Sequence, residues 1–169
     1  MKPGRVTKTD KTGQPFEIGT TCAEDFSCIC EMYHRFQPKA ASQGLPPEDP
    51  EICYNWIKQV FQIGENLLAL RGTTVIGHAA LILDNTGKSG EFIIFVDQNN
   101  RNLGIGTELT RLALEKSKEI GLDSIWLTVH VLNAIAIKLY RKFGFEYGDL
   151  DNYERVMRIK LTSSKTALD

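Results

Sequence analysis

The sequence contains no run of about eighteen apolar residues, the length that a membrane-spanning helix requires. It also lacks an excess of charge of either sign. Its 20 basic and 21 acidic residues give a net charge of -1, so its electrostatics do not favour binding to nucleic acid or to an anionic membrane. Residues 1–14 are polar and lack the apolar core of a signal peptide. We therefore expect a soluble, cytoplasmic protein that binds neither nucleic acid nor membranes.

Cysteine is scarce, and its spacing is not that of a metal site. Cys22, Cys28, Cys30 and Cys53 all lie in the first third of the chain and form no CxxC pair. Zinc sites and the disulfide frameworks of small secreted proteins depend on regular cysteine spacing. The pattern argues against both, predicts no metal, and favours buried free thiols in a reducing compartment.

Two common phosphate-binding motifs are missing as well. Gly104-Ile105-Gly106 is followed neither by the Lys-Ser/Thr of a Walker loop nor by the third glycine of a dinucleotide fingerprint. The chain has instead an RxxGxG pattern, formed by Arg101, Gly104 and Gly106. It follows a strand-like stretch, 91–96, that is dense in apolar residues, and it precedes a stretch, 105–120, with helical apolar spacing.

The glycines of this pattern lie where a strand gives way to the N-terminus of a helix. Such a junction has unpaired backbone N–H groups and the positive end of the helix dipole, and glycine lets a phosphate approach the main chain. The stretch therefore predicts an anion site, suited to a pyrophosphate. On this pattern alone, glycines that merely allow close packing of strand and helix are an equal alternative.

A second strand–helix junction follows. Residues 124–131 have the composition of a buried strand, Asn133 is placed as the N-cap of a helix over 134–143, and Gly144 ends that helix. Together the two junctions resemble the GNAT superfamily of acyl-CoA N-acyltransferases. The resemblance covers residues 65–150 and rests on Val96, Arg101, Gly104, Gly106, Val129, Asn133, Ala136, Leu139, Tyr140, Gly144 and Phe145.

The resemblance implies an α/β (α+β) fold with a mixed, mostly antiparallel central sheet flanked by helices. It also implies acetyl-CoA as cosubstrate, with its pyrophosphate on residues 101–107 and its pantetheine arm along 94–96, where two parallel strands splay apart. The cofactor-binding residues that it implies are Ile94, Phe95, Val96, Arg101, Asn102, Leu103, Gly104, Ile105, Gly106, Thr107, Asn133 and Tyr140. Arg101 either adds charge near phosphate or only holds the loop, and Asn133 both caps its helix and bonds the pantetheine.

The implied reaction is the direct attack of a primary amine on the thioester in a ternary complex. An amine with a pKa near ~10.4 is mostly protonated at pH 7, and its free base is disfavoured by about 4.6 kcal/mol. A general base is therefore useful, and the departing thiolate benefits from a proton donor. The superfamily places a tyrosine at the position of Tyr140 for the second role. For the first, Glu91 opens an apolar strand where burial raises a carboxyl pKa, although a solvated strand-start glutamate and a water base remain alternatives.

The acceptor stays open. The order of Glu91, Val96 and the RxxGxG pattern resembles bacterial protein lysine acetyltransferases that act on acyl-CoA synthetases, although those enzymes often lack a tyrosine equivalent to Tyr140. A protein lysine, a small amine and an amino acid are all candidate acceptors. A non-catalytic sensor that binds acyl-CoA is the alternative function, and a homodimer is one possible assembly.

The chain is long enough for one domain with a full core, which we place at residues 14–161, between a flexible leader, 1–13, and a flexible tail, 162–169. The segment 37–50 holds four prolines, so it is irregular, and it either lines the acceptor site or is a surface excursion. His78 and His130 are expected to be structural, and Trp56 and Trp126 to be core residues. The expected helices span 23–36, 51–63, 105–120 and 134–143, and the expected strands 16–18, 67–71, 75–83, 91–96, 124–131, 145–147 and 153–161.

Overall fold

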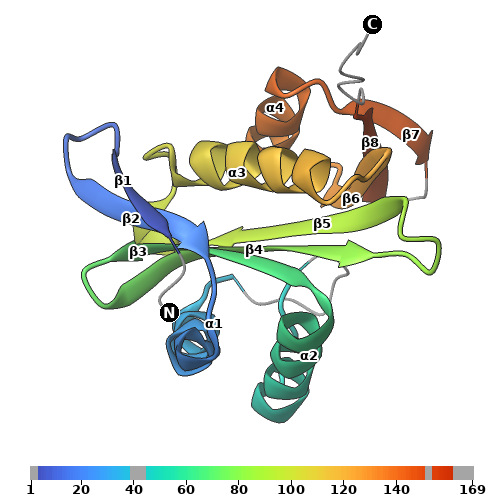
Figure 1. Cartoon of the computed structure of the whole chain (residues 1–169). Coiled ribbons are helices and arrows are strands. Elements are labelled where there is room, and N and C mark those ends of the chain that lie inside the picture. Colours follow the sequence, from blue (N-terminus) through green and yellow to red (C-terminus); the bar gives the residue numbers. More distant parts are fainter. Residues whose placement is uncertain (1–3, 39–44, 151–153, 162–169) are drawn as a thin grey trace, which may run out of the picture.

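The computed structural model describes residues 4–38, 45–150 and 154–161, and these form one twisted sheet with helices on both faces (Figure 1). In the described part of the chain, eight strands follow the order β1-β2-β3-β4-β5-β6-β8-β7. None of the described helices is both long and apolar enough to cross a membrane. The elements are β1 (Arg5–Thr9), β2 (Pro15–Thr20), α1 (Phe26–Arg35), α2 (Pro50–Ile63), β3 (Glu65–Arg71), β4 (Thr74–Leu83), β5 (Ser89–Val96), α3 (Ile105–Glu119), β6 (Ser124–His130), α4 (Ala134–Lys142), β7 (Glu146–Leu150) and β8 (Glu154–Lys160), with short 3₁₀ turns at Ala23–Asp25 and Gln98–Asn100.

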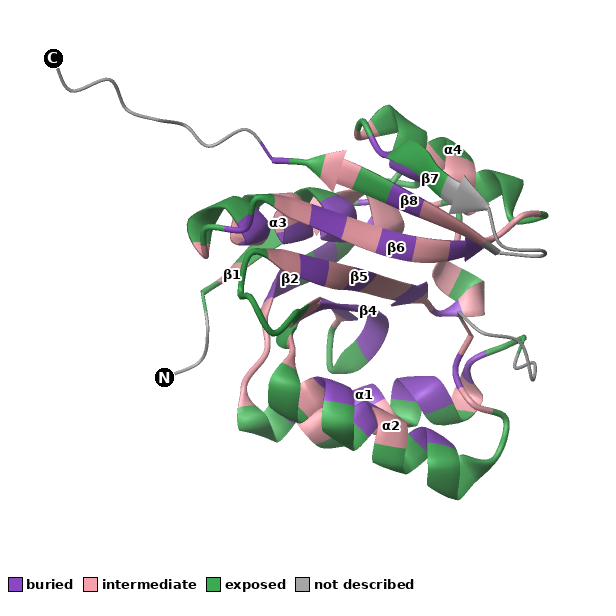
Figure 2. Ribbon diagram, turned by 90° about the vertical axis from the view of Figure 1, so that its right-hand side faces the viewer, coloured by how far each residue is buried: buried purple, intermediate pink, exposed green. Residues whose placement is uncertain are grey.

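The sheet separates two hydrophobic cores, and each core is covered by one pair of helices. Helices α1 and α2 cover one face of the sheet and α3 and α4 the other (Figure 1). Figure 2 shows α1 and α2 with buried residues toward the sheet and exposed residues outward. Side chains of a strand alternate between faces, so Phe92, Ile94 and Val96 of β5 pack with the α3 side, whereas Ile93 and Phe95 pack with the α1 side. Strand β5 therefore contributes to both cores.

The pairing of β5 with β6 is short. All neighbouring strands are antiparallel except these two, and their register covers only Ser89 with Ser124, Gly90 with Ile125 and Glu91 with Trp126. Beyond Glu91 the two strands separate, while β6 stays paired with β8 along its whole length. The edge of β5 from Phe92 to Val96 therefore has no strand partner on the β6 side.

A buried chain of polar groups ties both helices on the α1 side to the sheet. The Tyr33 hydroxyl lies 2.8 Å from His78 Nδ1, and His78 Nε2 lies 3.0 Å from Asn66 Oδ1. The Asn66 amide donates to backbone carbonyl oxygens at the end of α2, at 2.6 Å to Gly64 and 3.1 Å to Phe61. Since the amide nitrogen is thus committed, Asn66 Oδ1 must accept from His78 Nε2–H, and Nδ1 accepts from Tyr33. His78 is structural, as the sequence predicts.

The fold class and the expected helices and strands are confirmed, with bounds that differ by a few residues. The prediction of a flexible leader over 1–13 is wrong for its central part, because Arg5–Thr9 forms β1 and pairs along its length with β2. Its one strongly apolar residue, Val6, is exposed, so this edge strand lacks a clear alternating pattern. Trp56 and Trp126 are half-buried rather than fully in the core. The predicted tail at 162–169 lies outside the described residues.

All four cysteines are free thiols. Only Cys53 is buried, in the core between α2 and the sheet. The expectation of burial therefore holds for one thiol, and the other three are half-buried.

Candidate active site

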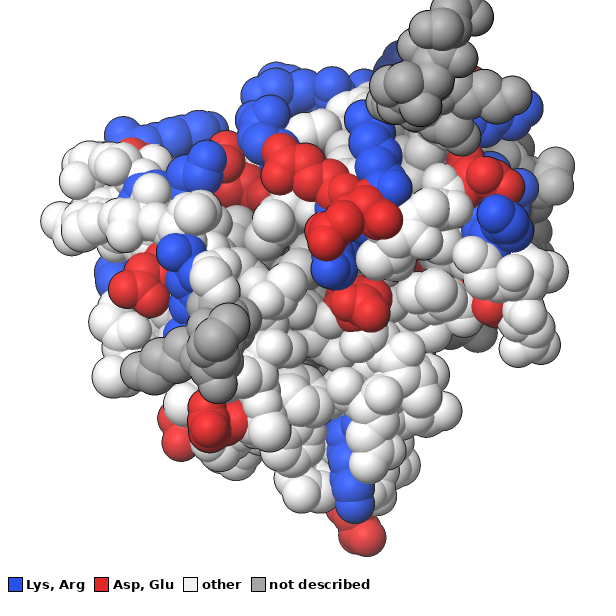
Figure 3. Space-filling view, viewed as in Figure 1, with Lys and Arg blue, Asp and Glu red and all other residues white. Residues whose placement is uncertain are grey.

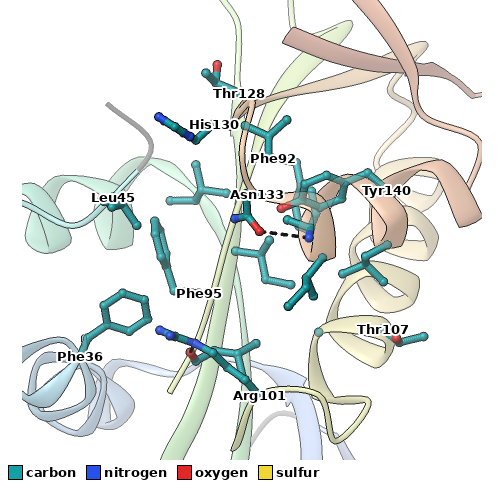
Figure 4. A pocket seen from close by; sticks show the side chains of 18 of the residues that line it. Phe36, Leu45, Phe92, Phe95, Arg101, Thr107, Thr128, His130, Asn133 and Tyr140 are labelled. Carbon is teal, nitrogen blue, oxygen red and sulfur yellow. Dashed lines mark hydrogen bonds between the residues drawn. The ribbon is translucent and has the colours of Figure 1, made fainter. Parts of the chain in front are cut away.

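A cavity of about 850 Å³ opens where β5 and β6 separate (Figure 4). Its walls come from the loop after β5 with the start of α3, from β5, β6 and α4, and from the chain around α1 and α2. Most of the predicted site residues line this one cavity, namely Glu91, Ile94, Phe95, Val96, Arg101, Asn102, Gly104, Gly106, Thr107, Asn133 and Tyr140. Residues from two separate sequence motifs thus meet in a single site.

Two predicted residues do not reach the cavity with their side chains. The side chain of Ile105, the first residue of α3, is fully buried in the core, and Leu103 packs against the same core. Each therefore has only its backbone to offer to a ligand. Phe95 lines the cavity, but its side chain points to the α1 side of the sheet, whereas those of Ile94 and Val96 point to the α3 side.

The start of α3 is open to an anion. Its first three residues are Ile105, Gly106 and Thr107, and the N–H groups of a first helical turn have no acceptor within the helix. The N-cap is Gly104, in the left-handed region with φ 95°, and no side chain caps the helix. Asn102 also has a positive φ, 63°. The loop thus turns sharply into the helix and leaves its positive end uncovered.

Gly106 keeps the space beside this helix end free. A Cβ atom at this position would lie 3.5 Å from Leu139 Cδ2 and 3.7 Å from Val96 Cγ2, and all three residues line the cavity. A side chain would therefore fill the space between α3, α4 and β5. These residues fit a ligand with a phosphate at the helix end and a narrow arm along β5.

Ion pairs hold the loop from both sides. Arg35 of α1 binds Asp97 with Nε 3.0 Å from Oδ2, and Asp97 is buried directly after β5. Arg71 of β3 pairs with the buried Asp10 and donates to Asn100 Oδ1 at 2.9 Å. The loop is therefore fixed before a ligand arrives.

Arg101 also holds the loop. Its Nε donates to the Val96 carbonyl oxygen at 3.1 Å, its Nη2 donates to the Gln37 carbonyl oxygen, and its guanidinium lies 5.0 Å from the centroid of the Phe36 ring. Burial lowers the pKa of Arg101, although the negative charge of Asp97 opposes this effect. Of the two roles expected for Arg101, these contacts support the holding of the loop.

Lys11 is a cation that the sequence motifs did not reveal. It lies in the turn between β1 and β2, its backbone N–H donates to the Leu103 carbonyl oxygen at 3.1 Å, and its side chain lines the cavity. Its Cγ is 3.8 Å from the point where a Cβ on Gly104 would lie. Nothing local indicates this contact, because Lys11 and Leu103 are 92 positions apart in the sequence and only the sheet brings them together.

Tyr140 and Asn133 lie on one wall of the cavity (Figure 4). The Tyr140 ring packs between Phe92 and Phe145, with centroid distances of 6.5 and 5.8 Å. Burial raises the pKa of Tyr140, so its hydroxyl stays protonated and is available as a donor. Asn133 caps α4 as predicted, because its Oδ1 accepts from the Ala136 N–H at 3.2 Å.

Glu91 is the sole carboxylate among the described residues that line the cavity. It is half-buried, and burial raises its pKa, as its place in an apolar strand predicts. By the alternation of β5 it shares the α1 side of the sheet with Ile93 and Phe95. Burial thus makes this carboxylate a stronger base than that of an exposed glutamate.

The wall on the α1 side is apolar and aromatic. The Phe95 ring meets Phe36 edge-on at 5.6 Å and Trp56 at 5.9 Å, and Trp56 in turn meets Tyr33 at 5.6 Å. Phe36, Trp56 and Phe95 line the cavity together with Leu45 and with Pro38 and Pro47. Of the two roles considered for the segment 37–50, its described residues favour the lining of a site over a surface excursion. Residues 39–44 lie outside the described part.

The sequence and the fold were compared with known proteins. A family model described as the acetyltransferase (GNAT) family matches residues 29–145. The chain is 35% identical over 86 residues to the L-amino acid N-acetyltransferase AaaT of Escherichia coli, which is 48% of this chain and 53% of that protein. It is 36% identical over 80 residues to an IAA acetyltransferase of Azospirillum brasilense, 47% of this chain and 52% of that protein. The chain thus spans about half the length of these curated relatives.

Solved structures agree in fold. The GNAT domain of S. lividans PAT superposes with a TM-score of 0.80 at 13% identity, over 93% of this chain and 97% of that chain. The acetyltransferase yncA of Salmonella typhimurium, whose structure includes its cofactor acetyl-CoA, has a TM-score of 0.67 at 18% identity, over 91% of this chain and 98% of that one. At these identities the likeness concerns the fold alone.

Proposed function

The chain belongs to the acetyltransferase (GNAT) family, and from this premise we propose that it is an N-acetyltransferase, which moves the acetyl group of acetyl-CoA to a primary amine. The observation that supports the proposal most is the cavity between β5 and β6. It combines an uncapped helix end, an unpaired strand edge and a protonated tyrosine. The relatives of E. coli and A. brasilense are named as acetyltransferases, and the S. typhimurium neighbour holds acetyl-CoA.

The cosubstrate fits the two open features of the site. The N–H groups of Ile105, Gly106 and Thr107 bind the pyrophosphate, and Lys11 adds a positive charge beside them. The free edge of β5 from Phe92 to Val96 binds the pantetheine arm through backbone hydrogen bonds, as an added strand would. Acetyl-CoA supplies a thioester carbonyl that an amine can attack.

Glu91 is proposed as the base, directly or through one water. An amine of the lysine type is disfavoured as free base at pH 7 by about 4.6 kcal/mol, so a base that accepts its proton contributes to the rate. The pKa of Glu91 is raised by burial, which brings its basicity closer to that of the amine. Backbone N–H groups of β5 near Val96 polarise the carbonyl that is attacked.

Tyr140 is proposed as the donor to the departing sulfur. A thiol like that of cysteine has a pKa near ~8.5, and burial raises the pKa of Tyr140 above that of a free tyrosine. Complete proton transfer to the thiolate is therefore uphill. The hydroxyl acts mainly by a hydrogen bond that stabilises the negative charge as it forms on sulfur.

The test is the release of free thiol from acetyl-CoA, followed with a chromogenic thiol reagent, across a panel of amines. Acetylation of at least one amine, confirmed by the mass of the product, is the expected result. Measurable binding of acetyl-CoA without turnover on any amine would contradict the proposal and would indicate a sensor of acyl-CoA.

A further inference from the structure

The acceptor half of the cavity has a composition that specifies a class of amine. We propose that the acceptor is a primary amine with an aromatic or branched apolar body, and with neither a carboxylate nor a second ammonium group. This inference rests on the proposed acetyltransferase function and concerns the same site.

The wall offers contact area to an apolar body. Phe36 follows α1, Trp56 belongs to α2 and Phe95 to β5, so three separate elements bring aromatic rings to one place. Leu45 lines the same side, opposite Tyr140 and Asn133 (Figure 4). Aromatic rings that meet edge-on bury large apolar areas and leave their exposed faces ready to stack with a further ring. A substrate without an apolar body would leave this wall in contact with water.

The charges of the site allow for one ammonium group and no more. Glu91 is the only acidic residue that lines the cavity in the described chain. A polyamine has a second ammonium group, which would find no second carboxylate in the described lining and would share the cavity with the guanidinium of Arg101. A lysine within a polar peptide would likewise place charged neighbours over apolar side chains. On the outer face in Figure 3, charges are few over α2, whereas charges of both signs mix over α3.

A carboxylate on the acceptor also lacks a partner. Arg101 lines the cavity, but it donates to the carbonyl oxygens of Val96 and Gln37 and lies over Phe36. Arg35, at the end of α1, is paired with Asp97 and donates to the Val75 carbonyl oxygen. The other cation of the described lining, Lys11, lies beside Gly104 at the start of α3, where the pyrophosphate is proposed to bind. A free amino acid would therefore bury its carboxylate against the aromatic wall without a free cation, which is costly.

The wall is rigid, which makes it selective. Tyr33 lies beneath it, in ring contact with Phe36, Trp56 and Phe95. The hydroxyl of Tyr33 is fixed by His78, which in turn is fixed by Asn66. Because the support is fully hydrogen-bonded and buried, the aromatic wall does not rearrange for substrates of other shapes.

The experiment measures kcat/KM at saturating acetyl-CoA for amines that differ in one feature at a time. Ethylamine lacks the body, 2-phenylethylamine and tryptamine have it, L-phenylalanine adds a carboxylate, and 1,5-diaminopentane and a lysine peptide add charge. We expect 2-phenylethylamine to exceed ethylamine by more than about 50-fold, since each buried methylene alone is worth roughly 10-fold. We expect L-phenylalanine and 1,5-diaminopentane to be at least about 10-fold poorer than 2-phenylethylamine, because each leaves an unpaired charge.

Two variants examine the wall itself. Trp56→Ala should lower kcat/KM for 2-phenylethylamine by about 10-fold or more, and kcat/KM for ethylamine by far less, so that the ratio between the two amines falls. Ile52→Ala, on the outward side of the same helix and 61% exposed, is the matched control and should change neither. Leu45→Glu places a second carboxylate on the wall and should raise the relative rate with 1,5-diaminopentane.

The outcomes separate the two proposals. Turnover that is fastest with an aromatic amine supports both. Turnover that is fastest with an amino acid, a diamine or a lysine peptide overturns the acceptor class and leaves the acetyltransferase function standing. Acetyl-CoA binding without turnover on any amine overturns both. The wild-type series alone decides these cases, so they do not depend on whether Trp56→Ala folds.

Discussion

The backbone N–H of Lys11 donates to the carbonyl oxygen of Leu103 at 3.1 Å, and this bond fastens the turn between β1 and β2 to the loop that begins α3. The side chain of Lys11 thereby reaches the cavity beside Gly104. A hairpin at the edge of the sheet thus brings a cation to the anion site proposed at the start of α3.

Lys11→Gln should weaken the binding of acetyl-CoA, because it removes a positive charge next to the phosphates. We expect KM for acetyl-CoA to rise by about 3- to 10-fold at low ionic strength, the range of one exposed charge pair with phosphate, and the effect to shrink as salt is added. The measurement is initial rate against acetyl-CoA concentration at two salt concentrations. Lys88→Gln makes the same charge change at the exposed turn between β4 and β5 and should have no effect. Equal KM values in both variants would remove Lys11 from the site.

Tyr140→Phe should lower turnover far more than it weakens cosubstrate binding. The variant keeps the ring contacts with Phe92 and Phe145, so the fold is retained, and it loses only the hydroxyl donor. We expect kcat to fall by about 100-fold, with KM for acetyl-CoA within about twofold. Tyr147→Phe, at a position that is 42% exposed, is the control. A Tyr140→Phe enzyme with the kcat of the wild type would show that another donor serves the sulfur.

Glu91→Gln should change the pH profile. Burial raises the pKa of Glu91 from its usual 4.5, so the wild-type rate should fall as the pH drops through this raised value and the base becomes protonated. The variant lacks that acidic limb, has a lower rate near pH 7, and reaches its optimum at higher pH, where the amine loses its proton unaided. The profile of kcat/KM from pH 5 to 10 measures this, with Glu65→Gln at an exposed position of β3 as control. An unchanged optimum would indicate that water alone is the base.

The same raised pKa has a consequence for stability. The folded state binds the Glu91 proton more tightly than the unfolded state, so ionised Glu91 destabilises the fold as pH rises above about 4.5. Glu91→Gln should therefore be slightly more stable than the wild type at pH 7, while being less active. Thermal unfolding of both proteins at pH 7 checks the direction.

His78 should make the protein sensitive to acid. Burial lowers its pKa from 6.5 to about 3, so the unfolded chain binds this proton more readily, and stability is lost as pH falls from about 6.5 toward 3. The loss amounts to at most about 1.4 kcal/mol per pH unit. Urea unfolding at several pH values should show a shallower acid slope in His78→Gln than in His34→Gln, which changes an exposed histidine of α1. Parallel slopes in the two variants would assign the acid sensitivity to carboxylates instead.

The uncapped helix start, on which the proposed anion site rests, was predictable because its signals are local. Gly104 and Gly106 follow a strand and precede a helical stripe, and these properties depend on neighbours within one turn of chain. Asn133 was predictable for the same reason, since a cap is a local hydrogen bond. The raised pKa of Glu91 followed from the apolar residues that flank it.

The remaining part of the site depends on pairing between distant segments. Lys11 meets Leu103 only because the four strands that lie between them in the sequence, β2 to β5, pair into one sheet. Phe36 meets Phe95 only because α1 packs across β5. Strand β1 was not predicted, because it lies at the edge of the sheet and its sequence, with an exposed Val6, does not alternate between apolar and polar residues. The side chains of Leu103 and Ile105 lie away from the cavity. The start of α3 turns its backbone toward the cavity, and these side chains therefore point to the opposite side, into the core.

The short pairing between β5 and β6 affects how firmly the two parts of the sheet are held together. Only three residue pairs join the strands β1 to β5 to the strands β6, β8 and β7, so the sheet is nearly two sheets. The pantetheine arm that is proposed to bond to β5 would take the place of the strand pairing that ends at Glu91. If acetyl-CoA binds there as proposed, its binding should stiffen the contact between the two parts of the sheet, and with it the C-terminal third of the protein.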